Sequence, residues 1–174
     1  ENVASSLTGG LGIASPQFGA PGALSYNPDV KFYEYNVELA KQMLADAGYP
    51  NGFDTTIFGT ADNEEHRNIA VMLQASLKEI GINAEIDMLD RTLVPERQVN
   101  ESMPGFIVTV GSSRQDFTNH YIRLDSSEGI KNHGLMVKPA DYEEALFGAR
   151  AAKTFEEKRE LLQAASQKLT EEYV

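Results

Sequence analysis

The segment over residues 62–90 constrains the fold more strongly than any other stretch of the chain. Its first half places apolar residues at three- and four-residue steps, at Ile69, Met72, Leu73, Leu77 and Ile80. Such spacing puts these side chains on one stripe of a helix. Asp62 and Glu65 have the spacing of a capping box, and Gly81 stands where a left-handed cap ends a helix. The segment therefore predicts a helix with one buried face and two defined ends.

A strand is expected immediately after this helix. Apolar residues at positions 82, 84, 86 and 88 alternate with Asn83, Glu85, Asp87 and Leu89. A period of two is typical of a strand with one face on a core. A helix that leads into a strand through a single glycine indicates an α/β fold.

The residues on either side predict more elements of the same two kinds. Asn36 is a natural N-cap for a helix whose apolar stripe ends at Gly48, and residues 53–59 have the composition of a strand. A short helix is expected over residues 92–101. The continuous apolar run at 106–110 predicts a strand that is covered on both faces rather than an edge strand.

Two helices are expected to close the chain, the first over residues 141–153. The second begins at Thr154, because Glu157 completes a capping box there, and it carries one apolar face made of Leu161, Leu162, Ala165 and Leu169. Glycine and proline are frequent in residues 1–34, which predicts an irregular arm after a short helix at 3–7. Residues 111–139 predict loops, with a short helix near 119–124.

Composition excludes several classes of function. The 15 Lys and Arg against 26 Asp and Glu give a net charge of −11, which would repel a nucleic-acid backbone or an anionic membrane surface. The absence of cysteine excludes disulfides, thiolate metal sites and cysteine nucleophiles. No apolar run reaches the roughly 20 residues of a membrane span. The first residues lack a secretion signal, so either a signal has been removed or the chain begins inside a longer protein.

Two sequence segments carry a family resemblance. The first is Ala-Gly-Tyr-Pro-Asn-Gly-Phe at 47–53, and the second is Leu-Lys-Glu-Ile-Gly-Ile-Asn at 77–83. Together and in this order they resemble the extracytoplasmic solute-binding proteins that serve ABC importers of oligopeptides, dipeptides and nickel. Residues 10–28 and 154–172 extend the similarity, less tightly, so that it covers nearly the whole chain.

The resemblance implies one lobe of a two-lobed fold of the periplasmic-binding-protein type II kind, with a small sheet flanked by helices. Members of the family are much longer than 174 residues, so the chain would be a fragment of a longer protein. We expect residues 1–174 to form a single α/β lobe, in four parts. These parts are an arm at 1–34, a core of alternating helices and strands at 35–110, cleft loops at 111–139 and two helices at 140–174.

The resemblance also places the ligand site in the loop after the strand at 106–110. Family members carry a Trp and an Asp there, and the Asp can pair with the amino group of a peptide ligand. This chain has no Trp, and both Asp116 and Ser113 fit the position of the acid. Arg114 would favour a carboxylate-bearing ligand, unless it forms a solvated ion pair with Asp116. The candidate ligand-binding residues are Ser112, Ser113, Arg114, Asp116, Phe117 and Tyr121.

Neither a metal site nor a catalytic site is expected. The spacing of His66, His120 and His133 matches no local metal motif, and His66 is expected to be exposed on the first turn of its helix. Ser112 does not lie in a nucleophile elbow, and the glycines at 9–12 do not follow a strand. The chain is therefore expected to be no enzyme and to need no cofactor.

These inferences lead to one function and one alternative. The chain is expected to be the substrate-capturing lobe of an ABC-importer solute-binding protein, on the periplasmic or outer face of the cell membrane. Its expected partners are an oligopeptide or other small solute, the N-terminal lobe of the same protein and the importer permease, with no nucleic acid and no membrane insertion. The alternative is a self-sufficient interaction or regulatory domain that keeps the lobe architecture and has no transport role.

Overall fold

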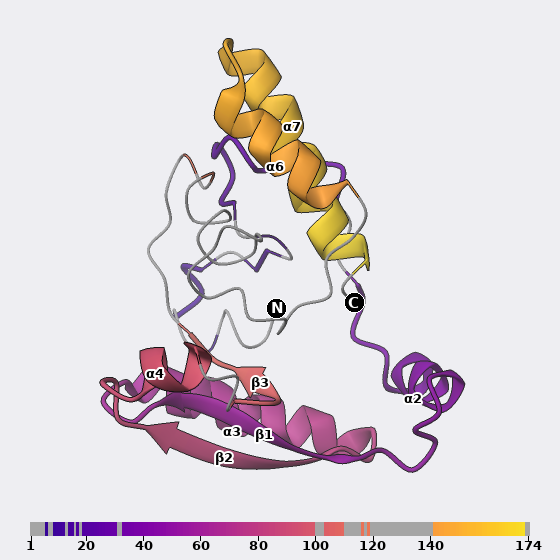
Figure 1. The fold of residues 1–174 in the computed structure, drawn as a ribbon. Coiled ribbons are helices and arrows are strands. Elements are labelled where there is room, and N and C mark those ends of the chain that lie inside the picture. The colour runs from indigo at the N-terminus through magenta and orange to yellow at the C-terminus, as the bar shows by residue number, and fades with distance from the viewer. Residues whose placement is uncertain are drawn as a thin grey trace. The chain divides into compact units, whose positions relative to one another are not determined.

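The computed structural model describes residues 6, 9–12, 14, 15, 17, 19–30, 33–99, 103–109, 116, 118 and 141–172. The chain divides into two compact units. Unit 1 contains Glu1–Ile13 and Glu34–Gly111, and unit 2 contains Ala14–Tyr33 and Ser112–Val174. Each unit is described by itself (Figure 1). The helix expected at 119–124, the helix expected at 3–7 apart from residue 6, and most of the loops expected at 111–139 lie outside the described residues.

Unit 1 is built on a parallel sheet of three strands. β1 (Asp54–Thr60) lies between β2 (Asn83–Leu89) and β3 (Phe106–Ile107). Ile57 of β1 is in register with Ile86 on one side and with Phe106 on the other. Helix α3 (Glu64–Glu79) connects β1 to β2, and the short helix α4 (Val94–Val99) follows β2 (Figure 1). The α/β fold predicted from the sequence is confirmed.

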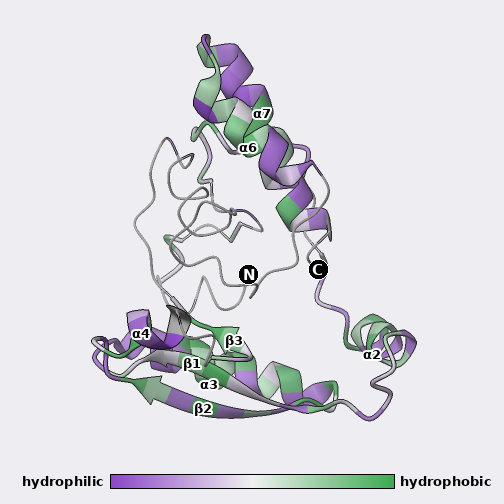
Figure 2. Ribbon diagram, viewed as in Figure 1, coloured by the Kyte–Doolittle hydropathy of each residue, from purple (hydrophilic) through white to green (hydrophobic). Residues whose placement is uncertain are grey.

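The core of unit 1 lies where α3 packs on the sheet. Its buried residues come from α3, β1, β2 and the residues next to the strands, namely Ile57, Ala70, Leu77, Ile82, Ala84 and Val108. Ile69 and Leu73 of the predicted helical stripe pack against this cluster. A second buried cluster contains Phe58, Leu89 and Met103. Figure 2 shows the alternation of hydrophobic and hydrophilic residues along β2 that the sequence predicts.

The ends of α3 show one confirmed prediction and one correction. Gly81 has φ +87°, and the amide of Ile82 donates to the carbonyl of Leu77 at 3.0 Å, which closes the helix with a Schellman motif. The N-cap is Asn63, not Asp62, because the Asn63 side chain accepts hydrogen bonds from the first-turn amides. Asp62 instead pairs with Arg91 at 2.8 Å. The amide oxygen of Asn63 can cap a helix as well as a carboxylate can. The sequence alone therefore does not decide whether residue 62 or residue 63 is the N-cap.

Two further expectations about unit 1 are wrong. Among the described residues, β3 is an edge strand of two residues, and Phe106 and Ile107 are 36% and 40% exposed. It was expected to be covered on both faces. His66 was expected to be exposed, but it is only 5% exposed. Its ring lies inside because the helix begins close to β1 and turns that position toward the strand.

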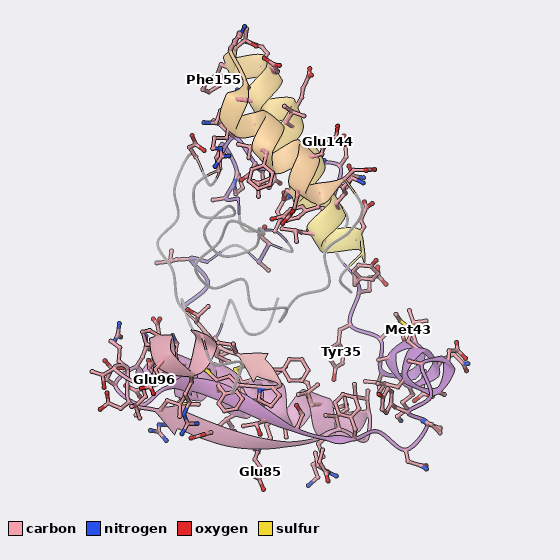
Figure 3. The ribbon with its side chains drawn as sticks, viewed as in Figure 1. Tyr35, Met43, Glu85, Glu96, Glu144 and Phe155 are labelled. Atoms are coloured by element: carbon pink, nitrogen blue, oxygen red, sulfur yellow. The ribbon has the colours of Figure 1, made fainter. Side chains whose placement is uncertain are left out.

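Helix α2 (Val37–Asp46) begins after the predicted N-cap Asn36, whose side chain accepts from the Leu39 amide at 2.9 Å. None of its residues is buried. Its side chains Leu39 and Met43 are 51% and 47% exposed, and Tyr35 before the helix is 72% exposed. Figure 3 labels Tyr35 and Met43. The predicted apolar stripe therefore exists, but half of it faces solvent.

Unit 2 centres on a pair of helices, α6 (Tyr142–Ala151) and α7 (Phe155–Glu172), which lie side by side in Figure 1. Their shared core contains Leu24, Tyr142, Ala145, Leu146, Ala149, Leu162 and Ala165. The predicted cap is confirmed, because the Glu157 amide donates to Thr154 Oγ1 at 3.1 Å. The Glu157 carboxylate accepts from the Lys153 amide, also at 3.1 Å.

The part of the N-terminal arm that belongs to unit 2 is bonded to α7. Gln163 Nε2 donates to the carbonyl of Tyr26 at 2.7 Å, and Ser166 Oγ donates to Gln17 Oε1 at 3.0 Å. These bonds satisfy backbone and side-chain polar groups that an irregular segment leaves free. Among the described residues, no helix combines the length and the apolar character of a membrane span.

Candidate functional site

The candidate ligand loop follows β3 along the chain. Of its six predicted residues, Asp116 lies within the described part of the chain. Ser112, Ser113, Arg114, Phe117 and Tyr121 lie outside it, so their placement as ligand contacts stays a prediction. The contacts of the loop are therefore described at Asp116 and its neighbour Thr118.

Both oxygens of the Asp116 carboxylate accept hydrogen bonds. Lys158 Nζ donates to Oδ2 at 2.6 Å, which makes a charge-assisted bond to helix α7. The amide and the hydroxyl of Thr118 both donate to Oδ1, at 2.9 and 2.5 Å. Thr118 is only 2% exposed, so this second contact is to a buried residue. Asp116 therefore joins its own loop to α7.

Two opposing effects act on the pKa of Asp116. Partial burial, the larger effect, raises the pKa, and the hydrogen bonds from Lys158 and Thr118 together with the charge of Lys158 lower it. The lowering effects outweigh burial in sum, and the pKa lies below the ordinary value of an aspartate. Asp116 is therefore a carboxylate at neutral pH.

Lys158 belongs to a firmly held part of unit 2. It lies on the first turns of α7, just after the Thr154 cap, and its amide donates to the Thr154 carbonyl at 3.2 Å. One turn further on, Leu162 is fully buried against α6. Sequence reasoning missed Lys158, because the two partners lie 42 residues apart and no local spacing connects them.

His66 is a buried polar residue beside the carboxyl end of β1. Its Nδ1 accepts from the Thr60 amide at 3.1 Å and lies 2.9 Å from Thr60 Oγ1. Within the described part of the chain, its Nε2 is buried with no hydrogen-bond partner. The same part of the chain contains no cluster of three side chains that could hold a metal ion. His66 thus fixes the end of β1.

A groove of unit 1 lies along the amino-terminal halves of β1 and β2. It has a volume of about 800 Å³ and is lined by residues of α3 and of the amino-terminal halves of β1 and β2, among them Asp54, Lys78 and Glu85. Ligand sites of open α/β sheets gather at the carboxyl ends of the strands, which is the other edge.

Residues 1–132 match the middle region of the bacterial extracellular solute-binding proteins of family 5. The chain belongs to this family. Three-quarters of the chain is covered by the match, which includes the whole of unit 1 and the loop that contains Asp116. The family resemblance noted in the sequence is confirmed.

Individual relatives agree with this assignment. The glutathione-binding protein GsiB of Escherichia coli is 31% identical over 80 residues, which is 45% of this chain and 16% of that protein. The structure of the periplasmic binding protein DppA of Helicobacter pylori, in complex with the peptide STSA, is 28% identical with a TM-score of 0.70. The match covers 87% of this chain and 30% of DppA.

A third relative, HbpA2 of Haemophilus parasuis, has a TM-score of 0.79 at 25% identity and is matched over 91% of this chain and 32% of its own. The chain thus spans about a third of the solved relatives. Its α/β fold is that of one lobe of these two-lobed binding proteins. The DppA of that structure is described as an ABC transporter-associated periplasmic binding protein.

Proposed function

We propose that the chain is the substrate-capturing lobe of an ABC-importer binding protein that takes up peptides or a related small solute. The match to family 5 over residues 1–132 carries the proposal. The peptide complex of DppA and the name of GsiB support a ligand with peptide bonds and free carboxylates. In this proposal, residues 1–174 form one lobe, and a second lobe of the same protein completes the site.

The proposed capture step is closure of two lobes around the solute. Hydrogen bonds from Ser112 and Ser113 orient the ligand, and Phe117 and Tyr121 supply apolar and stacking contacts. Arg114 pairs with a ligand carboxylate through two parallel hydrogen bonds. No step makes or breaks a covalent bond. The free energy of binding comes from contacts that exist in the closed state alone.

The exposed apolar side chains of unit 1 support a partner lobe over a self-sufficient domain. Tyr35, Leu39 and Phe106 are 72%, 51% and 36% exposed. Leu39 and Met43 lie one turn apart on α2, and adjoining exposed apolar side chains of this kind favour a protein–protein contact. In the proposal, the loaded protein delivers its solute to an importer permease at the outer face of the cell membrane.

A calorimetric titration of the full protein tests the proposal. The probes are glutathione and the tetrapeptide Ser-Thr-Ser-Ala, with glucose as a solute that lacks both amide and carboxylate. We expect saturable binding of at least one peptide probe and no heat from glucose. Arg114→Ala should weaken peptide binding by roughly tenfold, because a bidentate carboxylate contact is lost. The matched control Arg67→Ala removes an exposed arginine of α3 and should leave affinity unchanged. Absence of binding by every peptide probe would contradict the proposal.

A further inference from the structure

We propose that Gln17 is a positioning residue that fastens residues 19–30 of the N-terminal arm, here called the arm loop, on α7 through hydrogen bonds between neutral groups. Its partners in this role are Asn27 and Ser166, and the three residues together are called the amide clasp. The clasp, the arm loop and α7 belong to unit 2 and lie within the described residues. Because the clasp needs no ligand, it goes beyond the proposed function.

The side-chain amide of Gln17 forms two hydrogen bonds with the backbone of Asn27. Gln17 Nε2 donates to the Asn27 carbonyl at 2.8 Å, and the Asn27 amide donates to Gln17 Oε1 at 2.9 Å. A backbone N–H can only donate and a carbonyl can only accept, so one orientation of the glutamine amide satisfies both. The pair copies the double bond exchange of two antiparallel strands and joins residues ten positions apart. Gln17 therefore closes the arm on itself, as the ends of an Ω-loop are closed.

The same glutamine amide also reaches α7. Ser166 Oγ donates to Gln17 Oε1 at 3.0 Å. Next to this contact, Asn27 Nδ2 donates to Gln167 Oε1 at 3.3 Å. Ser166 and Gln167 follow Gln163 at the three- and four-residue steps of one helical face. A polar stripe of α7 therefore receives the arm loop.

Burial gives these bonds their weight. Asn27 and Ser166 are 8% and 2% exposed, and polar groups so far removed from water cost free energy unless they are bonded. Leu24 of the arm loop is also buried, in the core that it shares with α6 and α7. Hydrophobic burial is not directional, whereas hydrogen bonds are. The clasp therefore sets the orientation in which the arm loop lies on the helix.

The clasp contains amide and hydroxyl groups, which do not ionise in the ordinary pH range. Ionisable residues border it. The backbone amide of Asp29 donates to Asn27 Oδ1 at 2.9 Å, and Glu171 accepts from Gln167 Nε2 at 2.9 Å. Lys168 forms an ion pair with the residue before α6. The described partners of the Gln17 side chain are all neutral, so we expect the attachment of the arm loop to be independent of pH.

Gln17→Glu should convert the clasp into a pH switch, which a glutamine that only fills space could not become. A carboxylate cannot donate to the Asn27 carbonyl, so two oxygens would face each other without a proton between them. A protonated carboxyl group has nearly the shape of the amide and can donate again. The closed arm loop should therefore raise the pKa of the introduced carboxyl group above the ordinary value of about 4.3. Closure is then favoured at low pH and is weakened as the pH rises through the raised pKa.

Amide hydrogen exchange in the full protein, expressed as protection relative to the unfolded chain, measures closure at about pH 4 and about pH 7.5. In Gln17→Glu, residues 19–30 should lose protection roughly tenfold at the higher pH and stay within about twofold of the unaltered protein at the lower pH. Gln17→Met fills a similar volume without the bonds and should lose roughly tenfold at both. The matched control Gln42→Glu places the same charge on an exposed glutamine of α2 and should leave residues 19–30 unchanged.

Two results with Gln17→Glu would overturn the clasp. Equal loss of protection at both pH values would show that the glutamine only fills space, and full protection at both would show that its bonds contribute nothing. If either substitution at Gln17 also raises exchange in α6 and α7, Ser166→Ala removes one bond from the helix side instead. That variant should lower the protection of residues 19–30 by roughly threefold. Unchanged protection in Ser166→Ala would contradict the proposal.

Discussion

At the scale of single residues, Asp116 shows what the sequence could predict about the site and what it could not. The family resemblance marked Asp116, with Ser113 as the alternative, as the counterpart of the acid that pairs with the ligand, in a loop after a strand, where sites of α/β sheets gather. Its partner Lys158 could not be predicted, since the pairing depends on how α7 packs in unit 2. A charge far along the chain leaves no periodic signal in the sequence.

The pKa of Asp116 leads to a prediction about stability. A carboxyl group whose pKa is lower in the folded state stabilises the fold above its unfolded pKa of about 3.9, and this contribution is lost as the pH falls through the lower, folded pKa. Asp116→Asn should therefore lower the free energy of unfolding at pH 6 by less than about 1 kcal/mol, because the pair is partly exposed. Urea unfolding at pH 6 and at pH 3 measures this difference. A difference that persists unchanged at pH 3 would contradict the ion pair.

His66 supplies the second prediction at this scale. The sequence pattern placed it on an exposed turn, and the structure buries it with Nδ1 bonded to the Thr60 amide. His66→Ala removes a buried ring and leaves that amide without its acceptor, so we expect a loss of about 2–4 kcal/mol. Arg67→Ala, the exposed neighbour on the same helix, should cost less than about 0.5 kcal/mol. Chemical denaturation that shows equal costs would refute the buried role.

At the scale of elements, the sequence predicted which helices and strands form better than it predicted what covers them. Hydrophobic periodicity and helix caps depend on residues that are close together in the chain, so they can be predicted from the sequence. Examples are the periods of α3 and β2 and the caps at Asn36, Gly81 and Thr154. β3 was predicted to be covered because its residues are apolar. An apolar pattern reports that residues avoid water, but it does not identify the segment that shields them.

The turn between α2 and β1 gives a prediction for an element boundary. Gly52 has φ +72°, and a Cβ there would lie 2.0 Å from the carbonyl oxygen of Gly81. Gly52→Ala should therefore cost about 3 kcal/mol or more, since it adds a backbone clash to the strain of a positive φ. Gly48→Ala is the matched control, because Gly48 has φ +90° with no atom near its Cβ, and it should cost about 1 kcal/mol. Thermal unfolding in which both variants lose the same stability would contradict the close approach of the two turns.

At the scale of the whole molecule, the residues that show family membership are not the residues proposed to bind the ligand. Capping, turn and core positions made the chain recognisable, and these positions are structural. The candidate ligand residues lie in the loop after β3, where the chain lacks the family's Trp. The family thus predicts how the protein works, by closure on a solute, more firmly than it predicts which solute binds.

The central claim is that the site needs a second lobe. Isothermal titration calorimetry compares the 174-residue chain with the full protein, using the same peptide probe at the same pH and salt concentration. A lobe that offers about half of the contacts should bind roughly 100-fold more weakly than the complete site. Equal affinity of the two proteins would contradict the claim, because it would show that this chain captures its ligand alone.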